Sequence, residues 1–364
     1  MTGDLDPCRL TPDASLNRVR VVDLPGVALP PEVRGALAYD LLAATALVTH
    51  LRSRAGQLGF GAVNVAEPDV LLRRFDECFE HPDAAIRAAA EEVAEQFGAY
   101  LGYALLTLKR GDRANRAVRP EWGDGYWRHW AGVTRVHIGG GVVAGRLGPR
   151  LVAHAAQTLR DAGINDCSVQ LARWPMLLPL VGAARAMPPA GPPAVVLDIG
   201  HSFIKRARAE SHHGALTALR LLPAVSTPPT ELTAEGVSRL AAYVASVVAD
   251  TTREAADPGV ALAPTVVVCL AAYIRDGQPL PRIGDPFAAM AAIAGNLEIW
   301  LSQRASEQAG QPLEVTLLHD GTAAAYALAG EERAAVITLG TALGVGFSPP
   351  ADGFRPIGPG FSIT

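Results

Sequence analysis

The chain has 364 residues and a formal net charge of −4, from 32 basic and 36 acidic side chains. This length exceeds what one compact core needs and predicts two lobes. The slightly negative charge gives no electrostatic reason to expect nucleic acid or an anionic membrane as a partner, and we expect neither.

The cysteines, the N-terminus and the hydropathy together predict a cytoplasmic location. The four cysteines lie far apart without a CxxC pair, as expected of buried thiols in a reducing compartment. The N-terminal MTGDLDPCRL lacks the basic-then-apolar order of a signal peptide. No apolar run approaches the roughly 20 residues that a membrane span requires.

The first half of the chain begins with an irregular, proline-rich segment over residues 1–32. Apolar residues at helical spacing then predict helices over about 32–54, 83–109, 147–162 and 176–187. Strands are predicted over 133–138 and 168–172, and a polar surface loop with three tryptophans over 110–133. The stiff PPAGPP segment, 188–193, is the predicted boundary between the lobes.

The second half opens with a predicted hairpin over 194–210, AVVLDIGHSFIKRARAE. The elements predicted after it are a helix over 233–255, a strand over 265–271, a helix over 286–308, a strand over 314–320, a small-residue helix and a final hairpin over 334–347. Because strands alternate with helices, the predicted fold class is α/β.

Two of the predicted hairpins share one pattern, an apolar strand, a glycine, a small hydroxyl residue and a second strand. Gly200 with Ser202 stands in VVLDIGHSFIK, and Gly340 with Thr341 stands in VITLGTALGVG. Such turns expose backbone N–H groups that suit phosphate oxygens, and glycine permits a ligand to approach closely. Either turn alone is also compatible with an ordinary hairpin. The carboxylate of Asp198 before the first turn adds a metal ligand to the pattern.

The segment HDGTAAA places Asp320 where a predicted strand ends and a helix of very small residues begins. Parallel α/β sheets carry ligands and catalytic groups at this edge. Aspartate also caps helices without any chemistry, and local sequence does not decide between the two roles.

The segment HIGGGVVAG matches the dinucleotide fingerprint at Gly139, Gly141 and Ala144. The following strand, in SVQLARW, lacks the acidic residue that should hold a ribose. A dehydrogenase is therefore not expected.

Together these motifs resemble the actin/hexokinase/Hsp70 superfamily, and most closely the ROK family of bacterial sugar kinases. The first phosphate motif of that family, Asp-x-Gly-Gly-Thr-x-x-Lys, is similar to the segment with Asp198, Gly200, Ser202 and Lys205. HDGTAAA resembles the catalytic segment, with Asp320 as the base. The second phosphate motif is similar to 340–346, and the adenosine motif matches Gly139, Gly140 and Gly141.

The motif order differs from that of the family, because here the adenosine motif precedes the first phosphate motif. The resemblance therefore implies a circularly permuted chain with a two-lobed actin-like ATPase fold of the ribonuclease H-like kind. One lobe would combine 1–175 with 326–364, and the other would span 176–325. Permutation is tolerated where the old termini lie close together.

The resemblance implies an ATP-dependent kinase for a hydroxyl group of a sugar or similar small molecule, with ATP and Mg²⁺ as cofactors. Asp320 would be the general base, and Asp198 would hold Mg²⁺ through water. The implied nucleotide contacts are Gly200, His201, Ser202, Gly340, Thr341, Gly139, Gly140 and Gly141. The implied acceptor contacts are His319, Asp276 and Gly277. The sequence leaves a homodimer open.

Two departures from the family favour an alternative. His201 stands at the second glycine of the first phosphate motif, and the family's Glu-x-x-His and zinc motifs are missing. The alternative is a catalytically inactive relative that binds a nucleotide or metabolite as a sensor or partner protein. A third reading, an ATPase whose output is lobe motion, lacks the extra domains usual in that branch. Residues 1–32 are too short and proline-rich for a DNA-binding helix-turn-helix.

Overall fold

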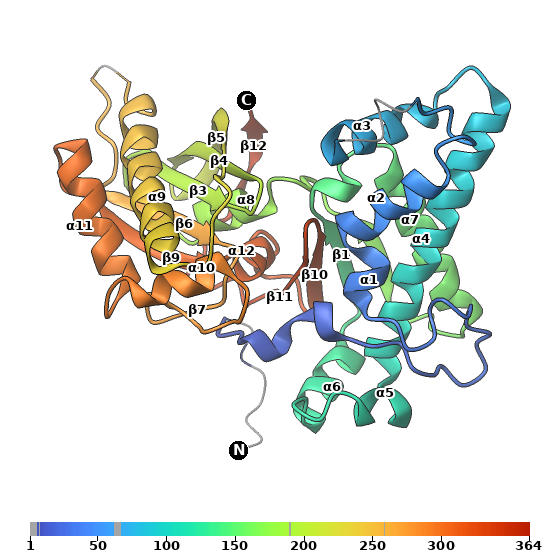
Figure 1. The fold of residues 1–364 in the computed structure, drawn as a ribbon. Coiled ribbons are helices and arrows are strands. Elements are labelled where there is room, and N and C mark those ends of the chain that lie inside the picture. The colour runs from blue at the N-terminus through green and yellow to red at the C-terminus, as the bar shows by residue number, and fades with distance from the viewer. Residues whose placement is uncertain (1–5, 7, 62–66, 189–190, 258) are drawn as a thin grey trace. The chain divides into compact units, whose positions relative to one another are not determined.

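The structure, a computed structural model, describes residues 6, 8–61, 67–188, 191–257 and 259–364 (Figure 1). The chain divides into two compact units. Unit 1 contains Asp13–Met176 and Arg333–Val345, and unit 2 contains Asp6–Pro12, Leu177–Glu332 and Gly346–Thr364. Part of the predicted linker, 189–190, lies outside the described residues. Within the described residues, no helix combines the length and apolar character needed to cross a bilayer.

Unit 1 is built on a sheet whose strand order is β11-β10-β1-β2. Its strands are β1 (Arg135–Gly139), β2 (Ser168–Leu171), β10 (Ala334–Leu339) and β11 (Leu343–Phe347). β1 pairs in parallel with both β10 and β2, so this sheet joins two distant stretches of the chain. The division between the units falls within β11.

The helices of unit 1 are α1 (Ala38–Leu42), α2 (Ala44–Ser53), α3 (Pro68–Cys78), α4 (Ala84–Arg110), α5 (Arg113–Ala117), α6 (Asp124–Gly132) and α7 (Leu147–Asp161). Short 3₁₀ turns occur at Leu16–Arg18 and Gly141–Val143. α4 starts at Asp83, whose side chain accepts the Ala85 N–H, and ends at Gly111 in the left-handed region. Small residues on α4 let α7 pack closely against it. A Cβ at Gly98 of α4 would lie only 2.4 Å from the Cβ of His154 on α7.

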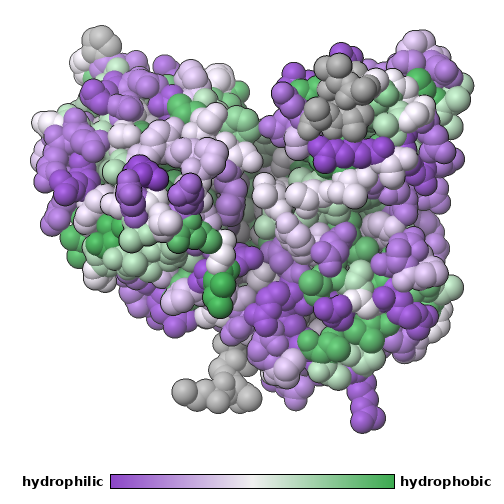
Figure 2. All heavy atoms as spheres, viewed as in Figure 1, coloured by the Kyte–Doolittle hydropathy of each residue, from purple (hydrophilic) through white to green (hydrophobic). Residues whose placement is uncertain are grey.

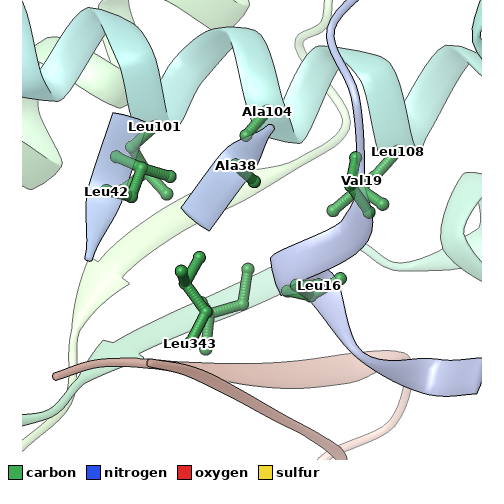
Figure 3. A pocket seen from close by; sticks show the side chains of 9 residues that line it. Leu16, Val19, Ala38, Leu42, Leu101, Ala104, Leu108 and Leu343 are labelled. Atoms are coloured by element: carbon green, nitrogen blue, oxygen red, sulfur yellow. The ribbon is translucent and has the colours of Figure 1, made fainter. Parts of the chain in front are cut away.

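A small pocket in unit 1 lies where α4, α1 and β11 meet (Figure 3). Every lining residue is apolar, namely Leu16, Val19, Ala38, Leu42, Leu101, Ala104, Leu108, Ile337 and Leu343. A void of this kind has no polar partner for water or for a charged ligand, so it belongs to the core.

Unit 2 is built on a sheet whose strand order is β12-β5-β4-β3-β6-β9. Its strands are β3 (Ala194–Ile199), β4 (Phe203–His212), β5 (Ala215–Ser226), β6 (Thr265–Leu270), β9 (Glu314–His319) and β12 (Ile357–Ile363). β3, β4 and β5 form an antiparallel meander, whereas β6 and β9 run parallel to β3. This arrangement confirms the α/β class and the predicted ribonuclease H-like sheet.

The helices of unit 2 cover both faces of this sheet. They are α8 (Leu178–Arg185), α9 (Ala234–Glu254), α10 (Pro286–Ala289), α11 (Leu297–Ala309) and α12 (Asp320–Tyr326), with a 3₁₀ turn at Met290–Ala292. α9 and α11 bury one face against alternate apolar residues of β3, β6 and β9 (Figure 1). Hydrophilic residues cover the outer surface of α11 (Figure 2). A small hairpin, β7 (Ile274–Arg275) and β8 (Gln278–Pro279), lies between β6 and α10 in the chain.

α12 is held on both sides by glycines that permit backbone contact. A Cβ at Gly182 of α8 would lie 1.7 Å from the Ala323 carbonyl oxygen, and one at Gly346 would lie 2.0 Å from that of Gly321. At the other end of the helix, the buried Arg185 guanidinium donates to carbonyl oxygens of Tyr326, Ala327 and Ala329. The small residues of α12 therefore serve close packing, which fixes the position of its first residue.

The outer edge of β9 is covered by side chains of α11. Glu298 Oε2 accepts the Leu317 N–H at 2.7 Å, and Ser302 Oγ accepts the Val315 N–H at 2.9 Å. Two backbone donors of this edge strand are thus already occupied.

Several predicted elements differ in the structure. The helix over 32–54 is broken at Ala43 into α1 and α2, and the one over 286–308 is broken before Asn296, which caps α11. The surface loop over 110–133 contains α5 and α6, and its tryptophans are buried. The C-terminal stretch 346–364, assigned to the first predicted lobe, belongs to unit 2 because β12 pairs with β5.

Candidate functional site

The turn between β3 and β4 is fixed by hydrogen bonds from both sides. The Gly200 N–H donates to the Phe203 carbonyl at 3.1 Å, which closes the hairpin. Thr227 donates its hydroxyl to the Gly200 carbonyl at 2.7 Å and its N–H to that of Ser202 at 3.0 Å. His201 and Ser202 are exposed at the tip of this rigid turn.

Asp198, just before the turn, forms a short ion pair with Lys205. The two residues are register partners on β3 and β4, and Lys205 Nζ lies 2.6 Å from Asp198 Oδ2. Asp198 is only 4% exposed. Burial alone would lower the pKa of Lys205. The nearby carboxylates of Asp198 and, to a smaller extent, Asp320 have a larger opposite effect, so the Lys205 pKa is raised. Lys205 therefore neutralises Asp198, in keeping with a structural charge.

Asp320 is the first residue of α12 and directly follows β9. Its Oδ1 accepts the Gly321 N–H at 2.6 Å, and its side chain is 28% exposed to solvent. Burial and then the charge of Asp198 raise the pKa of Asp320 to about 7. A carboxyl group with this pKa exchanges a proton near neutral pH.

His319 holds Asp320 from the preceding position. Its Nδ1 accepts the Thr322 N–H at 3.1 Å, so the neutral ring carries its proton on Nε2, which lies 3.3 Å from Asp320 Oδ1. The ring stacks on Tyr273 with centroids 4.2 Å apart. Burial, followed by the charge of Arg282, lowers the His319 pKa to about 3, so the ring stays neutral.

The N-cap role considered for Asp320 thus belongs to His319. Both ring nitrogens of His319 lie near groups of the protein, and its predicted contact with a substrate stays a prediction. His319 is better described as a positioning residue for Asp320.

Cys269 of β6 is a neighbour of the site that sequence reasoning did not single out. It is the register partner of Asp198, and its thiol donates to the Pro179 carbonyl at 3.6 Å. Burial and the charges of Asp198 and Asp320 raise its pKa well above the usual value, so the thiol stays protonated. Its position at the end of a predicted parallel strand was the available signal.

Asp276 and Gly277 form the two-residue turn of the β7–β8 hairpin. Both have positive φ, 49° and 76°, as a tight hairpin of this type requires. The exposed Asp276 carboxylate lies 2.6 Å from Arg9 Nη2, and a Cβ at Gly277 would lie 2.9 Å from the Cβ of Glu298. Local packing accounts for both residues, and their predicted contact with an acceptor stays a prediction.

The remaining predicted residues lie in unit 1. Gly139 pairs with Thr338, while Gly140 has φ 96° and a Cβ there would lie 2.2 Å from the Leu339 carbonyl oxygen. The close approach of β10 thus explains Gly140 without a ligand. Nothing lies within 4 Å of a Cβ at Gly141.

The second glycine turn, in the same unit, is tied to α2. The Ala44 N–H donates to the Gly340 carbonyl at 2.8 Å, and Thr341 is exposed. The predicted site residues therefore fall into two groups, one in each unit.

The carboxylates of unit 2 offer a limited set of metal ligands. Asp198 and Asp320 act on each other electrostatically, but across the described part of the chain no three His, Cys, Asp or Glu side chains gather as a metal cluster. Lys205 is bound to Oδ2 of Asp198, so Oδ1 of this carboxylate is left for a metal ion. The remaining oxygen of Asp198 fits a Mg²⁺ ion that keeps most of its water.

Neither a protein-family model nor a curated protein matches the chain. Among solved structures, it is similar to the Ppx/GppA phosphatase of Aquifex aeolicus in its type II variant, with 11% identity and a TM-score of 0.32 over 62% of this chain and 82% of that one. It is also similar to an exopolyphosphatase-like protein, with 11% identity and a TM-score of 0.28 over 66% and 86%. Likeness of this degree carries no argument about activity, so the functional interpretation depends on the geometry of unit 2.

Proposed function

We propose that the chain is a phosphotransferase of the actin-like ATPase superfamily that uses Asp320 as its general base. The observation that carries this proposal is a carboxyl group with a pKa of about 7 at the carboxyl end of β9, beside the Asp198–Lys205 pair. A general base works best when its pKa lies near the pH at which the enzyme operates. Asp320 would accept the proton of a hydroxyl group as that oxygen attacks phosphorus.

The surroundings of Asp320 support this role. Phosphoryl transfer depends mainly on positioning and charge neutralisation. Oδ1 of Asp320 accepts the Gly321 N–H and lies 3.3 Å from His319 Nε2, so Oδ2 remains for the acceptor hydroxyl. Asp198 would hold a hydrated Mg²⁺ through water at its Oδ1, and the ion when bound would supply positive charge to the phosphate oxygens.

More specifically, we propose a ROK-like kinase that uses ATP as the phosphate donor and a sugar or similar alcohol as the acceptor. These details rest on the motif resemblance. A circular permutation accounts for the motif order, and the sheet of unit 1 draws its strands from two distant stretches of the chain. Gly340, Thr341 and 139–141 would contact the nucleotide.

A second candidate is a catalytically inactive protein that binds a nucleotide or metabolite. The observation in its favour is His201, an imidazole exposed at the tip of the turn where the family has a second glycine. The two candidates differ in whether phosphate leaves ATP.

The test is transfer of labelled γ-phosphate from ATP to a panel of sugars and small alcohols, with release of inorganic phosphate measured alongside to detect water as the acceptor. Asp320→Asn should abolish both products while ATP binding by calorimetry persists. Asp250→Asn, an exposed aspartate on α9 paired with Arg253, is the matched control and should keep full activity. ATP binding without any product in the unmodified protein would favour the sensor, and absence of ATP binding would reject the kinase and the ATP-binding form of the sensor.

A further inference from the structure

We propose that Arg282 and His201 form a binding site for an oxyanion, a phosphate or carboxylate group, next to Asp320. The proposal deepens the proposed function and rests on Asp320 as the reacting centre. It implies that a negatively charged group, on the acceptor or on the nucleotide, is bound next to Asp320.

Arg282 lies in the turn between β8 and α10 and has little to hold it there. The Asp285 N–H donates to the Arg282 carbonyl, and Gly284 takes φ 79° to close the turn. The Arg282 side chain is 38% exposed, and its one ion pair within the described residues, to Asp285 Oδ2, spans 3.7 Å.

Asp285 is a weak partner because its other oxygen is already engaged. It is 5% exposed, and its Oδ1 accepts the N–H groups of Phe287 and Ala288 at the start of α10. A purely structural arginine would be expected to grip such a carboxylate with two short hydrogen bonds. Arg282 instead keeps most of its five N–H donors for another acceptor.

His201, in the turn between β3 and β4, contacts the start of α10. Its ring contacts that of Phe287 edge-on, with centroids 5.2 Å apart. Desolvation of the ring and the charge of Arg282 lower the pKa of His201, while the carboxylate of Asp285 acts in the opposite direction. The charge of Arg282 also lowers the pKa of His319. Asp285 links Arg282 to Phe287, whose ring contacts His201. Because β3 and β9 both pair in parallel with β6, the turn that carries His201 and the start of α12 lie at the same edge of the sheet.

The charges around Asp320 also favour an anion-binding role for Arg282. The carboxylates of Asp198 and Asp285 both raise the pKa of Asp320, and Lys205 is already bound to Asp198. Arg282 is the cation in this neighbourhood without a close partner among the described residues. An arginine that presents several donors in one plane matches an oxyanion, and an imidazole can donate a further hydrogen bond.

The anion could be carried by the acceptor alcohol or be the terminal phosphate of the nucleotide, and the two sources are separable. Isothermal titration calorimetry would measure binding of inorganic phosphate, glycerol phosphate and ATP to the full chain and to two variants, Arg282→Gln and Arg239→Gln. Arg239, an exposed arginine of α9 paired with Glu235, is the matched control. Thermal unfolding confirms that both variants fold.

Loss of a charge-assisted contact predicts that Arg282→Gln weakens phosphate binding roughly tenfold to hundredfold. The control variant should bind as the unmodified protein does. Weaker binding of phosphate and glycerol phosphate with unchanged ATP binding assigns the anion to the acceptor, and weaker binding of phosphate and ATP with unchanged glycerol phosphate binding assigns it to the nucleotide. Equal phosphate affinity in Arg282→Gln and the unmodified protein overturns the site, even if phosphate transfer is found. Loss of binding in Arg282→Gln but not in Asp320→Asn keeps the site even if transfer is not found.

Discussion

Nε2 of His319 lies 3.3 Å from Oδ1 of Asp320, while Nδ1 of the same ring accepts the N–H of Thr322. One imidazole thus caps α12 and orients the carboxyl group at its first position. The capping bond fixes the tautomer, so Nε2, the nitrogen nearest Asp320, carries the proton of the neutral ring.

His319→Asn separates these two roles. Asparagine is a good N-cap residue and should keep the helix start, but its shorter side chain cannot reach Oδ1 of Asp320. The carboxyl group then loses the imidazole that lies 3.3 Å from its Oδ1 and orients it, so the midpoint of the pH–rate profile should shift and kcat should fall about tenfold or more. An unchanged midpoint, with melting temperature also unchanged, would remove the positioning role.

Asp320→Asn should change how stability depends on pH. An aspartate whose pKa is raised from 3.8 to about 7 binds more protons folded than unfolded between these pH values, so stability falls as pH rises through this window. At 1.36 kcal/mol for each pKa unit the full shift corresponds to about 4 kcal/mol, which is the upper limit for the gain in stability of the variant over the unmodified protein at pH 8. The gain should shrink towards pH 4. Urea unfolding at both pH values measures it, and a gain that does not vary with pH would contradict the assigned pKa.

Lys205→Met should destabilise unit 2 because it leaves Asp198 buried without its partner. Removing one member of a buried ion pair costs about 3 kcal/mol. The double variant Asp198→Asn with Lys205→Met should recover part of this loss, which chemical unfolding would reveal as non-additivity. Additive losses would mean that the two charges do not stabilise each other.

Gly182→Ala tests the packing that positions α12. A Cβ would lie 1.7 Å from the Ala323 carbonyl oxygen, so the backbone must shift, with an expected loss of about 3 kcal/mol or more. Gly295→Ala is the control, since a Cβ there meets nothing within 4 Å. Equal melting temperatures for the two variants would argue against this close contact.

Gly141→Ala tests the predicted nucleotide contact in unit 1 without disturbing the fold. A Cβ at Gly141 has open space, so stability should change by less than about 0.5 kcal/mol while ATP binding weakens. Gly140→Ala is a poor probe, because its Cβ would lie 2.2 Å from the Leu339 carbonyl oxygen and the variant should be destabilised. Unchanged ATP affinity in Gly141→Ala would count against the predicted contact.

The elements with a strong local pattern could be predicted from the sequence. The apolar strand before Asp198, the strand before Asp320 and the turn at Gly200 are all found where the pattern put them. β12 was not predicted, because its Gly358-Pro359-Gly360 core has little strand propensity and its pairing with β5 depends on a distant segment.

The glycines show why the site was harder to predict than the fold. Glycine in a turn suggested ligand approach at Gly140, whereas the structure gives a close approach by Leu339, almost 200 residues away in the chain. Arg282 carried no sequence motif, because its place beside His201 and His319 depends on how the turn before α10 packs. Long-range neighbours of this kind leave no local signal.

The side chains of Glu298 and Ser302 on the edge of β9 also govern how copies of this chain can associate. A strand from another molecule cannot add beside Val315 and Leu317 without displacing acceptors that those N–H groups already have. Growth of this sheet by strand addition is therefore blocked on one side and confined to the β12 edge. A dimer formed by joining two such sheets would have to pair β12 with β12. This pairing uses the one open edge of each sheet, so no third copy could add by the same contact.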